Sequence, residues 1–239
     1  MKKSKVWFKL MFVGLLAALA LPLVAFVPAP AIAAPATGDP LSDAEAQGIL
    51  YMREEEKLAR DVYTTLYGVW GLPVFQNIAR SEQSHMDALK TLIDRYALVD
   101  PVTGAGVGEF ANADLQVLYN QLVARGRSSL TEALAVGALI EELDITDLQQ
   151  RIANVTHSDI AQVYQNLTNG SNNHLRAFVS TLGRYGESYE PVYLDQATFD
   201  QIVATGPAGS PGGNPRSNPR GGRGSAQASG MRGRGGRGK

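Results

Sequence analysis

Glu82 and His85 are the residues whose types and spacing most directly suggest chemistry in this sequence. Residues three apart on a helix lie on one face, about one turn from each other, so both side chains can reach the same metal ion. The apolar residues Ile78, Met86 and Leu89 border that face. The pattern predicts two metal ligands that point into a helical interior. Glu-x-x-His is common by chance, however, and needs corroboration from the rest of the chain.

Three further residues supply that corroboration. Glu56, Glu141 and His174 each occur near the middle of a different segment in which apolar residues repeat at helical spacing. Several carboxylates buried together without a cation cost several kcal/mol each, so protons, arginine or metal must neutralise them. Metal is the simplest answer, because the two histidines occupy facing positions.

Four long helices are expected to carry these side chains. Gly68 and Gly71 should end the first helix, and the second should end near Tyr96. The tyrosine-rich stretch 184–194 is expected to pack against the helices as a strap, and residues 197–204 to form a last short helix. The four long helices are predicted to begin at Ser42 or Asp43, near residue 74, after Ser128 or Ser129, and near Ser158.

A long connection separates the second helix from the third. Residues 99–108 have a loop composition with several glycines, and residues 114–123 form a short amphipathic piece. At roughly thirty residues, this segment far exceeds the usual connection of about 2 to 8 residues between helices. It is long enough to return the chain to its starting end. The third helix is therefore expected to run parallel to the second.

This arrangement resembles the ferritin-like superfamily over residues 42 to about 184. The strings MREEEKLARDVY, ARSEQSHM, GALIEELDI and NNHLRAF are similar, more closely, to a bacterial and archaeal ferritin-like domain family of unknown function. The resemblance implies an all-α fold, a ferritin-like four-helix bundle with a long crossover between helices 2 and 3. It also implies a metal centre with a glutamate from each of two helices and a Glu-x-x-His pair from each of the other two. The matching positions are Glu56, Glu82, His85, Glu141 and His174.

One position departs from that pattern. Ser171 lies three residues before His174, where a di-iron protein would carry a glutamate, and serine is a poor ligand for iron or manganese. Asp144, one turn after Glu141, or Glu142 could replace the missing carboxylate. Otherwise the site holds one metal, or two metals held asymmetrically.

Charge compensation without metal is the main alternative. Glu82 and His85 could form an internal polar pair with Arg53, which reaches in from the first helix. Glu54 belongs to a run of three glutamates and is expected to face solvent. His157 is expected to be a solvated or capping residue in the loop before the fourth helix.

The first residues of the chain have the composition of an export signal. Four lysines occur within residues 1–9, and the run Leu10–Val27 contains no charge. Small residues follow, so we predict a signal peptide over residues 1–36, with cleavage near Ala33 or Ala36. A run of this length could instead remain as an N-terminal membrane anchor. Either alternative predicts an exported protein that is secreted, periplasmic or associated with the cell envelope.

Charge is segregated along the rest of the chain. A linker at residues 37–41 precedes the predicted bundle at 42–205, and residues 41–206 hold 11 basic and 22 acidic residues. The tail, 206–239, is rich in glycine and arginine and contains seven basic residues and no acid. We expect it to be disordered and to bind anionic envelope polymer or nucleic acid weakly. The absence of cysteine excludes disulfides, thiolate metal sites and cysteine nucleophiles.

Two functional hypotheses of different classes follow. The first is an exported ferritin-like protein whose carboxylate and histidine ligands bind iron, with manganese or zinc as alternatives, and which oxidises Fe(II) with oxygen or peroxide. The second is a non-enzymatic envelope scaffold or interaction protein with a degenerate metal site, and Ser171 is its best support. The sequence predicts neither the number of metals nor the oligomeric state.

Overall fold

Six α-helices make up the part of the protein that the structure, a computed structural model, describes: residues 40–205. No strand occurs among these residues, and the all-α prediction is confirmed for them. The helices are α1 (Asp43–Trp70), α2 (Pro73–Arg95), α3 (Ala113–Gly126), α4 (Leu130–Ile152), α5 (Ser158–Arg184) and α6 (Gln196–Ala204).

The predictions for the two ends of the chain concern residues outside this part. The signal peptide or anchor, the linker as far as Asp39, and the basic tail from residue 206 all lie outside the described residues. They stay predictions. Within residues 40–205, no helix combines the length and the apolar character needed to cross a membrane.

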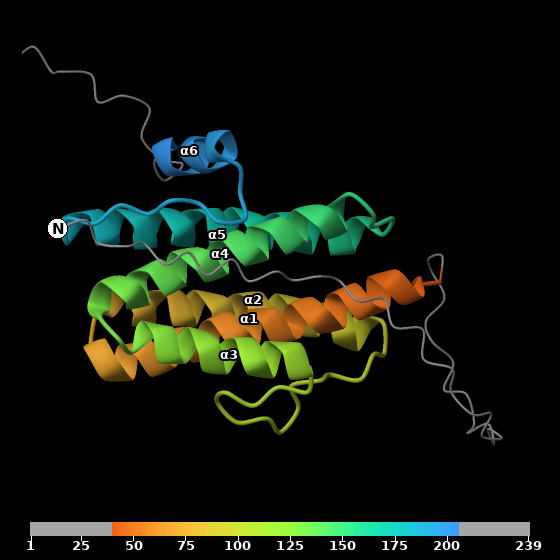
Figure 1. The fold of residues 1–239 in the computed structure, drawn as a ribbon. Coiled ribbons are helices and arrows are strands. Elements are labelled where there is room, and N and C mark those ends of the chain that lie inside the picture. The colour runs from red at the N-terminus through yellow and green to blue at the C-terminus, as the bar shows by residue number, and fades with distance from the viewer. Residues whose placement is uncertain (1–39, 206–239) are drawn as a thin grey trace, which may run out of the picture. The chain divides into compact units, whose positions relative to one another are not determined.

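Four long helices pack side by side around the core (Figure 1). Helix α1 contacts α2 and α4, and α5 also contacts α2 and α4, so each long helix has two long neighbours. The connection that contains α3 carries the chain from the end of α2 back to the opposite end of the molecule. As expected, α4 then runs parallel to α2, and α6 packs against α5.

Local capping explains where the first helix begins and ends. Ser42 and Glu45 form a capping box, in which the serine hydroxyl accepts a bond from the Glu45 amide at 3.2 Å and the glutamate accepts one from the Ser42 amide at 3.1 Å. Gly71 ends α1 in the left-handed conformation, with φ of 63°. The break predicted at Gly68 is wrong. A single glycine costs a helix about 1 kcal/mol, which packing of the surrounding turns can offset.

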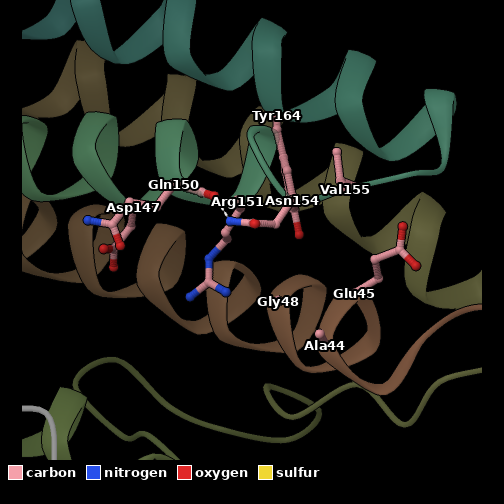
Figure 2. A pocket seen from close by; sticks show the side chains of 9 residues that line it. All are labelled: Ala44, Glu45, Gly48, Asp147, Gln150, Arg151, Asn154, Val155 and Tyr164. Atoms are coloured by element: carbon pink, nitrogen blue, oxygen red, sulfur yellow. Dashed lines mark hydrogen bonds between the residues drawn. The ribbon is translucent and has the colours of Figure 1, made fainter.

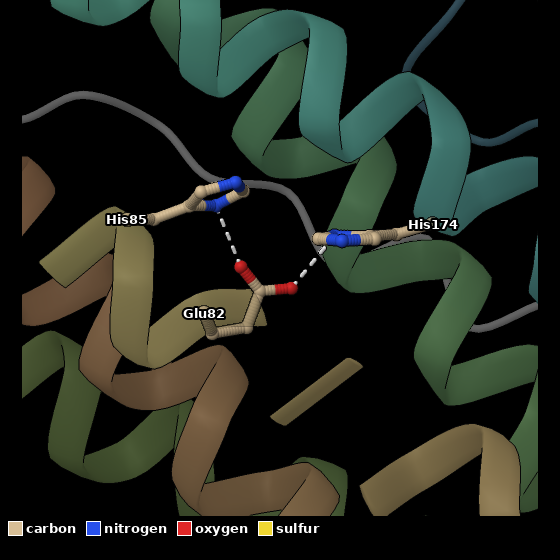
Figure 3. Close-up of side chains that lie close together, drawn as sticks. All are labelled: Glu82, His85 and His174. Atoms are coloured by element: carbon tan, nitrogen blue, oxygen red, sulfur yellow. Dashed lines mark ion pairs between the residues drawn. The ribbon is translucent and has the colours of Figure 1, made fainter. Parts of the chain in front are cut away.

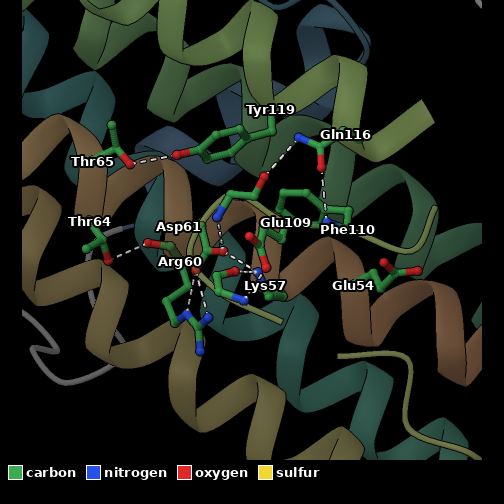
Figure 4. Close-up of polar contacts among 12 residues, drawn as sticks. Glu54, Lys57, Arg60, Asp61, Thr64, Thr65, Glu109, Phe110, Gln116 and Tyr119 are labelled. Carbon is green, nitrogen blue, oxygen red and sulfur yellow. Dashed lines mark hydrogen bonds and ion pairs between the residues drawn. The ribbon is translucent and has the colours of Figure 1, made fainter. Parts of the chain in front are cut away.

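Buried charges attach the crossover loop to α1 (Figure 4). Lys57 is only 1% exposed and donates to Asp61 at 2.5 Å and to the carbonyl of Gly106 at 2.7 Å. Its Nζ also lies 4.5 Å from the centroid of the Phe110 ring. Asp61 accepts a further bond, at 2.9 Å, from the amide of Gly108. One buried ion pair thus fixes two separate points of the loop.

The prediction that Glu54 faces solvent is wrong. Glu54 is 6% exposed, and its carboxylate accepts hydrogen bonds from the amides of Ala111 and Asn112 at 2.6 and 3.1 Å. The loop and the start of α3 cover this face of α1, and the periodicity of the long helices gives no sign of that cover. All three consecutive glutamates, Glu54 to Glu56, are buried as a result.

Replacing Asp61 with alanine should leave the Lys57 ammonium buried without its carboxylate. We expect the free energy of unfolding to fall by about 3 to 5 kcal/mol, measured by urea denaturation. Asp94→Ala is the matched control, because Asp94 pairs with Lys90 on the surface, where the two side chains are 63% and 41% exposed. That change should cost no more than about 0.5 kcal/mol. Equal losses in the two variants would contradict this account.

Candidate metal centre

Polar residues interrupt the apolar core at one level of all four long helices. On one side of this level lies an apolar cluster that includes Tyr63 and Phe178, and on the other side a cluster that includes Ile49 and Leu148. The polar residues between the clusters are Glu56 of α1, Glu82 and His85 of α2, Glu141 and Asp144 of α4, and Ser171 and His174 of α5.

Glu82 lies between the two histidines at the centre of this group (Figure 3). Its Oε2 is 2.7 Å from Nδ1 of His85, and its Oε1 is 2.8 Å from Nδ1 of His174. The two imidazole rings stack, with centroids 5.4 Å apart and planes inclined by 29°. Glu-x-x-His on α2 thus meets a histidine from α5, although the two helices are joined only through a long stretch of chain.

Glu56 and Glu141 complete the set of five residues predicted from the sequence. Oε2 of Glu56 lies 3.2 Å from Nδ1 of His85, and Oε2 of Glu141 lies 3.4 Å from Nδ1 of His174. The hydroxyl of Tyr63 donates to Oε1 of Glu141 at 2.6 Å. The structure therefore brings all five residues together. Their role as metal ligands stays a prediction.

Asp144 lies beside Ser171, the position where a conventional di-iron protein has a glutamate. The Ser171 hydroxyl is hydrogen-bonded to Oδ2 of Asp144 and also lies 2.9 Å from the carbonyl oxygen of Leu167. Oδ1 of Asp144 is buried and has no hydrogen-bond partner. The carboxylate proposed to replace the missing glutamate is thus at the site, with one oxygen free to bind.

Two residues of this region were missed by the sequence reasoning. Glu55 is buried, and Asp147 and Asp144 of α4 lie near enough for their charges to act on it. Its position in a run of three glutamates gives no sign of burial, because such charge runs usually lie on a solvated helix face. Ser81 places its hydroxyl 2.8 Å from Nε2 of His174, and no feature of the sequence distinguishes this serine.

Arg53 does not supply the positive charge that the alternative without metal requires. Its guanidinium pairs with Asp100 at 3.1 Å and donates to the carbonyl of Met86 at 2.6 Å. No ion pair of the described residues joins Arg53 to Glu82. The arginine binds the start of the crossover loop, because Asp100 comes close to α1 there.

Glu82 and the two histidines form the charged centre of the site. Burial alone would raise the pKa of Glu82, but His174 and His85 outweigh burial and hold that pKa well below its usual range. Burial lowers the pKa of each histidine, whereas the adjacent carboxylates raise it, to about 12 for His85 and about 10 for His174. Without metal, both imidazole rings are therefore protonated on both nitrogens and positively charged at neutral pH.

The other carboxyl groups hold their protons more tightly than usual. Burial raises the pKa of Glu56 to about 8 and that of Glu141 to about 7, although the histidine next to each one partly offsets the effect. Burial and neighbouring acids raise the pKa values of Glu55 and Asp144 well above their usual ranges. The two protonated rings do not balance the charge of all these carboxylates. The remaining carboxyl groups must therefore be neutralised by protons.

The donor set fits a metal ion. Glu82, His85 and His174 each offer one ligand atom, and these atoms all lie within 4.8 Å of one another. Buried polar atoms without a hydrogen-bond partner are costly, and they gather here. The atoms concerned are Oε1 of Glu56, Oε1 of Glu82, Oδ1 of Asp144 and Nδ1 of His174. Oε1 of Glu82 and Nδ1 of His174 are close enough to pair but are not aligned for a hydrogen bond.

The fold and the site define an all-helical protein with a buried cluster of histidines and carboxylates. The chain belongs to the family described as an uncharacterized protein domain, DUF2202, which it matches over residues 45–206. It is 49% identical over 166 residues to the uncharacterized protein MJ0754 of Methanocaldococcus jannaschii, a match that covers 70% of this chain and 90% of that protein. The crystal structure of the hypothetical protein MJ0754 from Methanococcus jannaschii is similar, with a TM-score of 0.70 and 47% identity over 72% of this chain and 98% of that one.

Gly170 of α5 allows the His85 ring to lie against the helix backbone. A Cβ atom at this position would overlap Nε2 and Cε1 of the ring. We expect Gly170→Ala to push the ring away from Glu56 and Glu82, so that its pKa falls from about 12 towards the ordinary value of about 6.5. NMR of the ring between about pH 5 and 9 should show a titration that the wild-type protein lacks.

Gly183→Ala is the control for this change. Gly183 lies on the same helix, and a Cβ atom there meets nothing within 4 Å. The His85 ring of this variant should stay protonated throughout the titration. An unchanged ring in Gly170→Ala would show that the close approach does not hold His85 in place.

Proposed function

We propose that this protein is a ferritin-like four-helix bundle, formed by α1, α2, α4 and α5, that binds a metal centre. The observation that carries the proposal is Glu82, which lies 2.7 and 2.8 Å from histidines of two different helices inside a group of buried carboxyls. The long crossover before α4 and the single polar level across four helices support it. Export, which rests on residues 1–36 alone, would place this metal centre outside the cytoplasm.

The residues have distinct roles in this proposal. Glu82 would hold the metal from the centre, and His85 and His174 would bind it from either side. Glu56 and Glu141 contribute carboxylates from α1 and α4, and each already contacts one of the histidines. Binding would satisfy the buried oxygens that have no hydrogen-bond partner, and it would replace the protons that otherwise balance the charge.

Iron is the metal that we propose, with manganese and zinc as alternatives. Carboxylate oxygens combined with two imidazoles suit all three ions. Iron would supply an electron to oxygen or peroxide as Fe(II) becomes Fe(III). The residues of the chain would hold the ion in an interior from which apolar clusters on both sides exclude water.

The scaffold hypothesis accounts for Ser171 but leaves the rest of the site without a purpose. A degenerate metal site has no need for buried polar atoms without partners, and three carboxyl oxygens and one ring nitrogen of this kind belong to this cluster. Each unsatisfied buried polar group costs about 1 to 3 kcal/mol. A bound cation removes that cost, and we therefore favour metal binding.

Protein purified without a histidine tag and loaded with iron should hold metal in stoichiometric amount, measured by elemental analysis after gel filtration. His174→Ala should lose at least about 90% of this metal, because it removes one of the three central ligands. His157→Ala is the matched control, since His157 lies at the start of α5 and pairs with Glu45 instead. Equal metal content in both variants would favour the scaffold.

The same iron-loaded protein separates binding from oxidation. If the centre is redox-active, Fe(II)-loaded protein should consume oxygen or peroxide faster than free Fe(II), and the His174→Ala variant should not. Loaded protein that consumes neither oxidant would refute the oxidase activity and leave metal binding intact.

Metal binding should release protons and should strengthen as the pH rises. His85, His174 and Glu56 have pKa values of about 12, 10 and 8 without metal, so all three are mainly protonated at pH 7. Each must lose its proton to become a ligand, and the affinity should therefore rise by at least about tenfold per pH unit between about pH 6 and 8. Calorimetry with Mn(II) in two buffers of different ionisation enthalpy measures both quantities. An affinity that is constant or falls over this range would contradict the assignment.

A further inference from the structure

A second cavity lies near one end of the helices and shares no residue with the proposed metal centre (Figure 2). Its volume is about 450 Å³, within the range of roughly 300 to 1,000 Å³ that is typical of small-molecule sites. Three helices contribute the residues that matter here: Gly48 from α1, Arg151 from α4 and Tyr164 from α5. Gly48 lies about two turns of α1 before Glu56.

Arg151 brings an incompletely satisfied guanidinium to this cavity. Its Nε is buried and has no hydrogen-bond partner, and the group stacks over the ring of Tyr51, with Cζ 4.7 Å from the ring centroid. None of the ion pairs within residues 40–205 includes Arg151, although its charge acts at longer range on Asp147 and Glu55. Figure 2 shows the side chain extending from α4 towards Gly48.

Tyr164 adds a second donor without a partner. The residue is 2% exposed, yet its hydroxyl forms no hydrogen bond. Burial raises the pKa of this phenol to about 12, so the hydroxyl keeps its proton at neutral pH and remains a donor. An unused buried hydroxyl is costly, and its position on the cavity wall indicates that a bound group could use it.

Gly48 keeps the space between these two donors open. A Cβ atom there would lie 3.2 Å from the Tyr164 hydroxyl oxygen and 3.3 Å from Nη1 of Arg151, closer than ordinary contact. Glycine inside a helix costs about 1 kcal/mol relative to alanine. Gly48 has an ordinary helical backbone, so conformation does not require glycine. The remaining reason for glycine at position 48 is the space that it leaves in front of Arg151 and Tyr164.

The carboxylates on the cavity wall, those of Glu45 and Asp147, already have hydrogen-bond partners. Both oxygens of Glu45 accept bonds, Oε1 from the amides of Thr156 and His157 and Oε2 from Ser42. Asp147 is hydrogen-bonded to Glu55 and Tyr51, neither of which lines the cavity. The two buried side-chain atoms of the wall that lack a partner, Nε of Arg151 and the Tyr164 hydroxyl, are both donors, so a ligand that uses them must bring acceptor oxygens.

The charges on the wall restrict the kind of acceptor. Arg151 favours an anion, but Glu45 and Asp147 would repel a group with two negative charges. A planar carboxylate matches the fork of a guanidinium and carries a single charge. The apolar side chains of Ala44 and Val155 also line the cavity, and they suit the hydrocarbon part of a small organic acid.

We propose that this cavity binds a small monocarboxylate, whose oxygens accept hydrogen bonds from Arg151 and Tyr164. The site is independent of the metal centre, because no residue of the proposed centre lines the cavity. The two proposals can therefore fail separately.

Titration of the full chain with sodium butyrate, followed by the NMR signal of the Arg151 Nε–H group, tests this site. We expect a saturable shift. Gly48→Ala should raise the dissociation constant by at least about tenfold, because the methyl group fills the space in front of the two donors. Gly68→Ala is the matched control on the same helix, where a Cβ atom meets nothing within 4 Å, and it should bind as the wild type does.

Two further measurements keep the proposal open to refutation. Tyr164→Phe should weaken butyrate binding about threefold to tenfold through loss of one hydrogen bond, even if Gly48→Ala were to unfold the protein. Inorganic phosphate should bind at least about tenfold more weakly than butyrate. The absence of saturation up to about 100 mM butyrate, or equal binding by the wild type and Tyr164→Phe, would overturn the site. Tighter binding of phosphate would overturn the carboxylate assignment.

Discussion

Burial of negative charge in a helical interior is the constraint on which the rest of this structure depends. Five carboxyl groups, those of Glu55, Glu56, Glu82, Glu141 and Asp144, lie in the core together with two imidazoles. Apolar clusters on both sides keep water away, so each charge acts on its neighbours with little screening. The result is a division into an ionised centre, Glu82 with two protonated histidines, and surrounding acids that keep their protons. A bound cation is the alternative, because it would neutralise the buried carboxylates without added protons.

The path of the chain is what places those side chains at one level. Neighbouring long helices all run antiparallel, because the crossover returns the chain before α4 begins. The same crossover adds buried charges of its own, Lys57 with Asp61 and Arg53 with Asp100. These pairs fix the loop to α1, and they also use the two cations that flank the run of glutamates on α1. The lysine and arginine that the sequence places beside Glu54, Glu55 and Glu56 are therefore unavailable to neutralise the centre.

The sequence was sufficient to find the five central residues, since each lies on the apolar stripe of a long helix. Residues that are surrounded by distant parts of the chain are harder to predict from the sequence. The loop before α3 covers Glu54, and Arg53 pairs with Asp100 of the distant loop that follows α2. Ser81 touches His174 through a contact between helices that no local pattern encodes. Helical periodicity predicts which face of a helix is apolar, but not what covers its other faces. Capping was easier to predict, because Ser42 and Glu45 are neighbours in the chain.

Serine at position 171, where the di-iron pattern would have a glutamate, has a consequence for the whole site. On α5 the serine leaves His174 as the sole ligand-type residue at this level, while α1 and α4 bring Glu55, Glu56, Glu141 and Asp144. The imidazoles thus come from α2 and α5 and the outer carboxyls from α1 and α4, and Glu82 reaches towards both histidines from α2. If a metal binds as we propose, its nitrogen ligands would come from α2 and α5, and carboxylates from α1 and α4 would join them. In the metal-bound state that we propose, Asp144 would supply from the neighbouring helix the carboxylate that position 171 lacks, so the centre would be asymmetric where a conventional di-iron site has two equivalent halves.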